Sequence, residues 1–125
     1  MKKQPPAAGK VLIVEDDHDL LALINILLTH HHFEVLTAVT GAEARSLFAA
    51  NADGLTSVVL DLTLPDADGE AIARDLRELA PDLPIVITTG MEDAHRQERL
   101  TAMGIQACLI KPFDLTHLVD VLTRL

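Results

Sequence analysis

Acidic residues stand directly after two strongly apolar runs of the sequence. Glu15, Asp16 and Asp17 follow the run VLIV, and Asp61 follows the run SVVL. Two unit charges about 4 Å apart repel by roughly 4 kcal/mol at an effective dielectric constant of 20. Because such crowding makes carboxylates harder to ionise, these acids need a counter-charge. Magnesium is a suitable one, since it binds one or two carboxylates, several waters and a phosphate oxygen.

Asp61 has the chemistry of a nucleophile toward phosphorus. A carboxylate can attack a phosphoryl group and form an aspartyl phosphate. That transfer depends mainly on positioning and on neutralising charge at the equatorial oxygens. Lys111, after the apolar run ACLI, offers a compact cation, and Thr89, at the end of IVITT, offers a hydroxyl donor. A metal ion, this lysine and this threonine could together surround one phosphoryl group.

Apolar runs alternating with helical stripes predict how these residues are brought together. We predict strands at residues 11–14, 33–36, 57–60, 85–90 and 105–110. We predict helices near residues 20–30, 41–48, 72–79, 91–103 and 114–125. Five strands alternating with five helices imply a parallel sheet covered by helices on both faces. Ligands bind at the carboxyl ends of such strands, where the acids, Thr89 and Lys111 are expected.

The composition narrows the class of protein. Apolar residues make up 49% of the chain and aromatic residues 2%, so the core must be built from aliphatic side chains. The net charge of −9 argues against direct nucleic acid contact, which needs clustered lysine and arginine. A single cysteine, Cys108, excludes an internal disulfide framework and is consistent with a cytoplasmic location. No apolar run approaches the roughly 18 residues of a membrane span, so we expect no membrane insertion.

Four motifs of the chain resemble those of a known family: VLIVEDD, VVLDLTLPDADG, PIVITTG and LIKPF. They are similar to the receiver domain of two-component response regulators of the chemotaxis-regulator type, and the resemblance covers residues 10–125. It implies a flavodoxin-like, doubly wound α/β fold of three layers, with five parallel strands in the order 2-1-3-4-5. Residues 1–9 are expected to form a flexible tail. The chain is expected to be a stand-alone regulator, a receiver from a larger protein or the tail of a hybrid kinase.

The resemblance implies roles for the acidic residues. Asp61 corresponds to the phosphoacceptor of the family, and Glu15 and Asp16 to its acidic pair. These three carboxylates and the backbone carbonyl of Thr63 would hold Mg²⁺ or Mn²⁺, with Asp16 and the Thr63 carbonyl as direct ligands.

The resemblance also implies a phosphate contact and a switch. Lys111, with a cis bond to Pro112, corresponds to the lysine that contacts the phosphoryl group, and Thr89 to the switch threonine. Receivers usually carry Phe or Tyr three residues before the lysine, where this chain has Cys108. A change at the switch threonine must therefore be transmitted to partners through another part of the surface.

By the same resemblance, the chain is a signalling module rather than an enzyme, one that catalyses its own phosphoryl transfer and dephosphorylation. A sensor histidine kinase or a phosphotransfer protein would donate the phosphoryl group. The modified protein would bind an effector protein or domain through the fourth helix, fifth strand and fifth helix, a face through which a homodimer could also form.

Two side chains near the site are predicted to set the lifetime of the phosphorylated state. In the family, the residues two positions after the phosphoacceptor and two after the switch threonine shape the access of water. Here these residues are Thr63 and Met91, and neither is an acid or amide that would orient an attacking water well. We therefore predict a fairly long-lived phosphorylated state.

Other functions fit the sequence less well. A phosphohydrolase of the haloacid-dehalogenase type needs a second acid two residues after the nucleophile, where Thr63 stands. A flavin-binding protein of flavodoxin type would use Trp or Tyr to stack on the ring, and the chain has neither. A phosphorylation-independent interaction module stays open because of Cys108.

Several polar residues have a simpler interpretation. Asp17 is interpreted as a helix cap, a role that Asp16 could share. His30, His31 and His32 fit a solvated helix end, and Cys108 fits a small core residue. The charged segment 91–103 has only a narrow apolar stripe, so we expect this helix to dock weakly.

Overall fold

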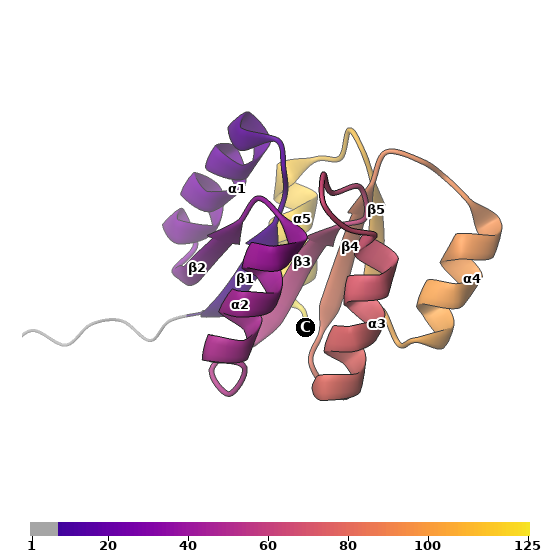
Figure 1. Ribbon diagram of the computed structural model, residues 1–125. Coiled ribbons are helices and arrows are strands. Elements are labelled where there is room, and N and C mark those ends of the chain that lie inside the picture. Colours follow the sequence, from indigo (N-terminus) through magenta and orange to yellow (C-terminus); the bar gives the residue numbers. More distant parts are fainter. Residues whose placement is uncertain (1–7) are drawn as a thin grey trace, which may run out of the picture.

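A computed structural model describes residues 8–125 of the chain as a five-stranded parallel sheet with five helices (Figure 1). The strands are β1 (Gly9–Val14), β2 (Phe33–Ala38), β3 (Ser57–Asp61), β4 (Ile85–Thr89) and β5 (Ala107–Ile110), in the order β2-β1-β3-β4-β5. This confirms the predicted doubly wound α/β fold and its strand order. Residues 1–7 of the predicted tail lie outside the described residues.

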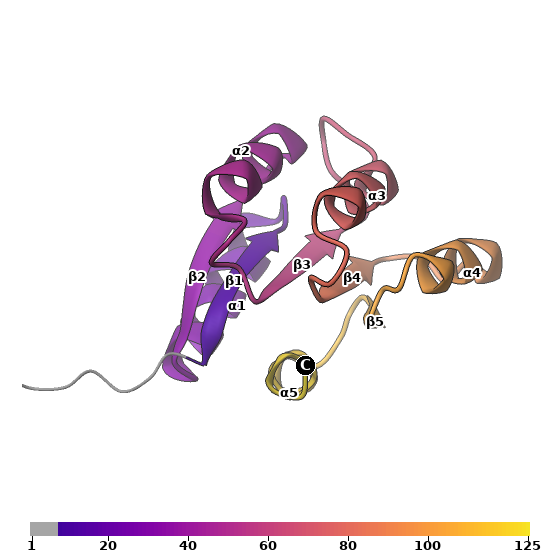
Figure 2. The same cartoon turned by 90° about the horizontal axis from the view of Figure 1, so that it is seen from below.

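The helices cover both faces of the sheet. They are α1 (His18–His30), α2 (Gly41–Asn51), α3 (Gly69–Leu79), α4 (Ala94–Ala102) and α5 (Leu115–Thr123). Buried residues of α2 and α3 pack in one core cluster, and those of α1 and α5 in another. Figure 2 shows α2 and α3 on one side of the sheet and α5 on the other.

Both cores are aliphatic, as the composition requires. Along β1, Leu12 and Val14 face the cluster with α2 and α3, whereas Val11 and Ile13 face the cluster with α1 and α5. This alternation is the period of two of a strand buried on both faces. The three-layer arrangement holds the carboxyl ends of the strands in place.

Helix α4 buries little of its surface, as its narrow apolar stripe predicted. Leu100 is its only buried residue, and the helix stands apart at the edge of the molecule (Figure 1). The helix starts later than predicted because the Asp93 carboxylate accepts from Arg96 N–H and caps it at Ala94. After its end, Gly104, at φ 77°, reverses the chain and its N–H donates to Thr101 O, and β5 begins only at Ala107. Only glycine adopts this φ readily.

The interpretation of Cys108 as a core residue is correct only in part. The side chain packs against the cluster with α2 and α3 but is half-buried. The physical reason is that β5 is an edge strand of four residues, with only Leu109 buried.

The polar helix ends agree with the predictions. Asp17 caps α1, accepting hydrogen bonds from Asp19 N–H at 3.0 Å and Leu20 N–H at 3.1 Å. His30, His31 and His32 are exposed where α1 ends. Within residues 8–125, no helix has the length and apolar character needed to cross a membrane.

Candidate functional site

Asp61 is the last residue of β3, and its buried side chain is held from two sides. Thr63 N–H donates to Oδ1 at 3.0 Å, and Lys111 Nζ donates to Oδ2 at 3.0 Å. The strand end is fixed by β4, because Leu62 N–H donates to Thr88 O at 3.0 Å. A rigid sheet therefore presents this carboxylate at its carboxyl edge, the upper edge in Figure 1.

Lys111 links Asp61 to Glu15. Its Nζ lies 2.7 Å from Glu15 Oε1 and 3.0 Å from Asp61 Oδ2, and both acids are 2% exposed. The backbone of Lys111 is fixed as well, since its N–H donates to Thr89 O at 2.7 Å. The Lys111-Pro112 bond is cis, as predicted.

The charges of this cluster act on one another. Burial raises the pKa of Glu15 to about 7, against the opposing effects of Lys111 and of the Asp17 N–H. Burial lowers the pKa of Lys111, but its contacts with Glu15 and Asp61 outweigh this and leave the pKa above its ordinary value. The lysine is therefore a lasting positive charge beside Asp61.

The acidic cluster has the composition of a divalent cation site. Glu15, Asp16 and Asp61 each offer an oxygen, and these oxygens lie within 4.8 Å of one another. Glu15 Oε1 is buried and receives no hydrogen bond of good geometry from residues 8–125, although Lys111 Nζ is close. Among residues 8–125, these three carboxylates have one neighbouring ammonium group, that of Lys111. A hard cation that takes oxygen ligands would balance the remaining negative charge, so the residues fit Mg²⁺. Asp16 is exposed and gives the cation access from solvent.

Comparison with known proteins identifies the family. The family model described as "Response regulator receiver domain" matches residues 11–123. The chain belongs to the response regulator receiver domains. It is thus a signalling domain of two-component systems, as the motifs predicted.

Individual relatives agree with this assignment. The transcriptional regulatory protein PrrA of Mycobacterium tuberculosis is 36% identical over 110 residues, which are 88% of this chain and 46% of PrrA. The transcriptional regulatory protein KdpE of Staphylococcus aureus is 30% identical over 110 residues, again 88% of this chain and 46% of the relative. The chain therefore spans about half the length of these relatives.

Solved receiver structures share the whole fold. The non-phosphorylated HemR receiver domain from Leptospira biflexa has a TM-score of 0.86 and 33% identity, covering 93% of this chain and 92% of that one. A response regulator receiver domain protein from Clostridium thermocellum has a TM-score of 0.86 and 27% identity, with the same two coverages.

The hydroxyl of Thr89 contacts the loop that follows its own strand, β4. Thr89 Oγ1 accepts a hydrogen bond from Met91 N–H at 3.2 Å and lies 3.5 Å from Met91 O. Thr89 is 2% exposed, whereas Met91 is 69% exposed. The structure thus places Thr89 at the correct strand end, with its hydroxyl engaged by Met91 rather than by Asp61.

Cys108 borders a hollow between α4 and β5. The hollow measures about 250 Å³ and is lined by Gln97, Leu100, Thr101, Ile105, Gln106, Ala107 and Cys108. Burial raises the pKa of the Cys108 thiol. In this receiver the position therefore holds a small neutral side chain beside a weakly packed helix.

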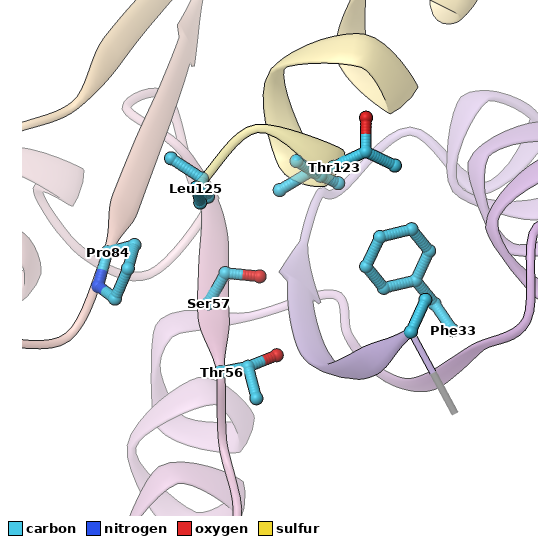
Figure 3. A pocket seen from close by; sticks show the side chains of 8 residues that line it. Phe33, Thr56, Ser57, Pro84, Thr123 and Leu125 are labelled. Carbon is cyan, nitrogen blue, oxygen red and sulfur yellow. The ribbon is translucent and has the colours of Figure 1, made fainter. Parts of the chain in front are cut away.

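A second hollow lies at the opposite edge of the sheet (Figure 3). It measures about 200 Å³ and is lined by Ala8, Phe33, Thr56, Ser57, Pro84, Leu122, Thr123 and Leu125. Phe33 and Ser57 begin their strands, so this hollow is remote from Asp61. It contains no ionisable side chain and is not a candidate for the chemistry.

Sequence analysis missed two polar contacts near the site. Asp66 lies within the motif VVLDLTLPDADG without an assigned role, yet its carboxylate binds the start of α2. Glu70 was not singled out, yet it is buried and binds arginines of α4. The only signal for either was an acid beside an apolar segment, which is also typical of a helix start.

Proposed function

We propose that this receiver domain accepts a phosphoryl group on Asp61. The observation that carries the proposal is the position of Asp61, buried at a strand end, 3.0 Å from Lys111 and within the cluster formed with Glu15 and Asp16. Chemically, an Asp61 oxygen attacks phosphorus while the bond from phosphorus to a histidine nitrogen of the donor breaks. That nitrogen keeps the bonding electron pair.

The residues around Asp61 have distinct parts in this proposal. Glu15, Asp16, Asp61 and the Thr63 backbone carbonyl would hold Mg²⁺ or Mn²⁺, which would neutralise charge on the phosphoryl oxygens. The Lys111 ammonium would bind another of these oxygens. It stays protonated there because its pKa lies above the ordinary value.

The Thr89 hydroxyl would leave Met91 and donate a hydrogen bond to the phosphoryl group. This would change the loop between β4 and α4, and α4 buries only Leu100, with polar contacts to α3 holding the rest of the helix. Phosphorylation would therefore act on the face formed by α4, β5 and α5. Cys108 stands where receivers usually carry an aromatic side chain that moves with the threonine. The signal would therefore reach this face through the movement of α4 itself.

Partners follow from this role. The donor would be a sensor histidine kinase or a phosphotransfer protein, and the α4, β5 and α5 face would bind an effector or a second copy of the chain. The net charge of −9 favours a protein partner over direct nucleic acid contact. A cytoplasmic setting, where kinases and phosphodonors occur, fits this assignment.

The test is the intact mass of the protein after incubation with acetyl phosphate and Mg²⁺. We expect one added phosphoryl group that requires the metal and is absent from Asp61→Ala. Asp53→Ala, which removes an exposed acid outside the site, serves as the matched control and should be modified like the wild type. If no adduct forms on the wild type, the interaction-module alternative replaces this proposal.

A further inference from the structure

Asp66 connects the loop after Asp61 to a different helix. It lies between β3 and α3, and its carboxylate accepts two backbone hydrogen bonds, from Gly41 N–H at 2.7 Å and from Ala42 N–H at 3.0 Å. These donors are the first two residues of α2. One side chain thus joins the loop of the candidate site to a helix start 25 residues earlier in the chain.

The start of α2 needs this carboxylate. A helix begins with four backbone N–H groups that have no partner within the helix. The Thr40 hydroxyl serves one of them, accepting from Glu43 N–H at 3.1 Å. Asp66 serves two more, those of Gly41 and Ala42. The two backbone donors hold the pKa of Asp66 below its ordinary value, so the charged form is favoured.

Helix and loop are also shaped for close approach. A Cβ atom on Gly41 would lie 2.8 Å from Ala67 Cβ, 2.9 Å from Ile72 Cδ1 and 3.3 Å from Asp66 Oδ1. Carbon atoms are normally about 3.5–4.0 Å apart in such contacts. A larger residue at position 41 would force Ala67 of the loop or Ile72 of α3 to shift.

The base of the same loop is closed by other contacts. Thr63 pairs with Asp68 in an antiparallel bridge, and Gly69 N–H donates to Leu62 O at 3.1 Å. The tip of the loop consists of residues 64–67. Within the described chain, its hydrogen bonds to another helix or strand are the two that Asp66 accepts from α2. Leu64 and Ala67 of the tip also pack against the core cluster with α2 and α3, and Asp66 adds the hydrogen bonds that orient the tip against the start of α2.

We propose that Asp66 is a positioning residue for the phosphorylation site, holding the loop so that the Thr63 carbonyl stays in place to bind the divalent cation. This inference rests on the proposed function of the site. Asp66 itself touches neither Asp61 nor the acidic pair. Its loss would leave every metal ligand present and weaken only the order of the loop that carries one of them.

The experiment compares Asp66→Ala with Thr40→Ala in the full chain. Both variants remove an acceptor from the start of α2, but only the first releases the loop. Mn²⁺ affinity is measured by electron paramagnetic resonance, and hydrogen exchange of the Thr63 N–H is measured by NMR in metal-free protein. For Asp66→Ala we expect about tenfold weaker Mn²⁺ binding, the low end of losses for groups that orient metal ligands, and faster Thr63 exchange. Thr40→Ala should match the wild type in both.

Two results would overturn the inference. One is Mn²⁺ affinity that is equal in Asp66→Ala and Thr40→Ala, and the other is Thr63 exchange that is unchanged in metal-free Asp66→Ala. Asp66→Asn, which keeps an acceptor oxygen, tests the same point if the alanine variant does not fold, and it should recover part of the affinity. A wild type that neither binds Mn²⁺ nor accepts a phosphoryl group would instead refute the proposed function, and the inference with it.

Discussion

Arg99 of α4 donates two hydrogen bonds to the carboxylate of Glu70 on α3. Its Nε donates to Oε2 at 2.9 Å, and its Nη2 donates to Oε1 at 3.0 Å. Arg96 Nε lies 3.4 Å from the same carboxylate. At the other end of α4, Arg77 of α3 donates to Met103 O at 2.8 Å and to Gly104 O at 3.1 Å. Because α4 buries only Leu100, charged contacts with α3 contribute much of its attachment.

Glu70→Gln should therefore destabilise the protein and loosen α4. Breaking a buried ion pair can cost about 3–5 kcal/mol. Arg99 is 52% exposed, however, and solvent screens the pair, so we expect a loss of about 1–2 kcal/mol in the free energy of unfolding. Urea unfolding followed by circular dichroism measures it. The exposed pair Arg45 and Asp75 is the control, and Asp75→Asn should change stability little.

Hydrogen exchange gives the second readout for Glu70→Gln. Backbone amides of α4 should exchange faster than in the wild type, while those of α5 should not change. Equal acceleration in both helices would mean a general loss of stability and would count against a specific role of Glu70 in holding α4.

The contribution of Glu70 should also depend on pH. The hydrogen bond from Arg99 and the nearby arginine charges, opposed by burial, hold its pKa below the ordinary value. An acid with a lowered pKa stabilises the fold above its unfolded-state pKa of about 4.3 and loses this contribution as pH falls through the folded-state pKa. The stability difference between wild type and Glu70→Gln should thus be constant near neutral pH and shrink below about pH 4. Unfolding curves from pH 7 to pH 3 test this, and a constant difference would contradict it.

Lys111→Met should destabilise the metal-free protein, because Glu15 and Asp61 would stay buried without their cation. Removing one partner of a buried pair costs about 3–5 kcal/mol, and we expect the lower end because Lys111 is 26% exposed. Added Mg²⁺ should restore part of the loss, since it supplies positive charge to the same acids. Thermal unfolding with and without Mg²⁺ measures both effects. Lys10→Met is the control, because Lys10 Nζ donates to the neutral Asn51 and should give no recovery with Mg²⁺.

The parts of the fold that follow from local pattern could be predicted from the sequence. Apolar runs such as Val11–Val14 are read directly, and the acids after them mark the strand ends. Element ends were less predictable. Helix α4 starts at Ala94 rather than at residue 91 because Asp93 caps it, and β1 starts as early as Gly9 because its neighbour β2 pairs with it there.

The contacts that position the site could not be predicted in the same way. Asp66 and the start of α2 are 25 residues apart in the chain, and Glu70 and Arg99 are 29 residues apart. Nothing in either local sequence shows which partner an exposed-looking acid will find. Thr89 shows the same limit, since its residue type was predicted but the engagement of its hydroxyl by Met91 was not.

Met91→Glu should shorten the life of the phosphorylated state. Met91 is 69% exposed and follows Thr89 at the rim of the site, so a carboxylate there could accept a hydrogen bond from water and orient it toward phosphorus. We expect dephosphorylation to be several-fold faster, measured as loss of the phosphorylated mass after the phosphodonor is removed. Leu79→Glu introduces the same acid at another exposed apolar position, remote on α3, and should leave the rate unchanged. Thr63→Asn should act in the same direction from the other side of the site. Rates that are unchanged or slower in both site variants would show that access of water is not what sets the lifetime.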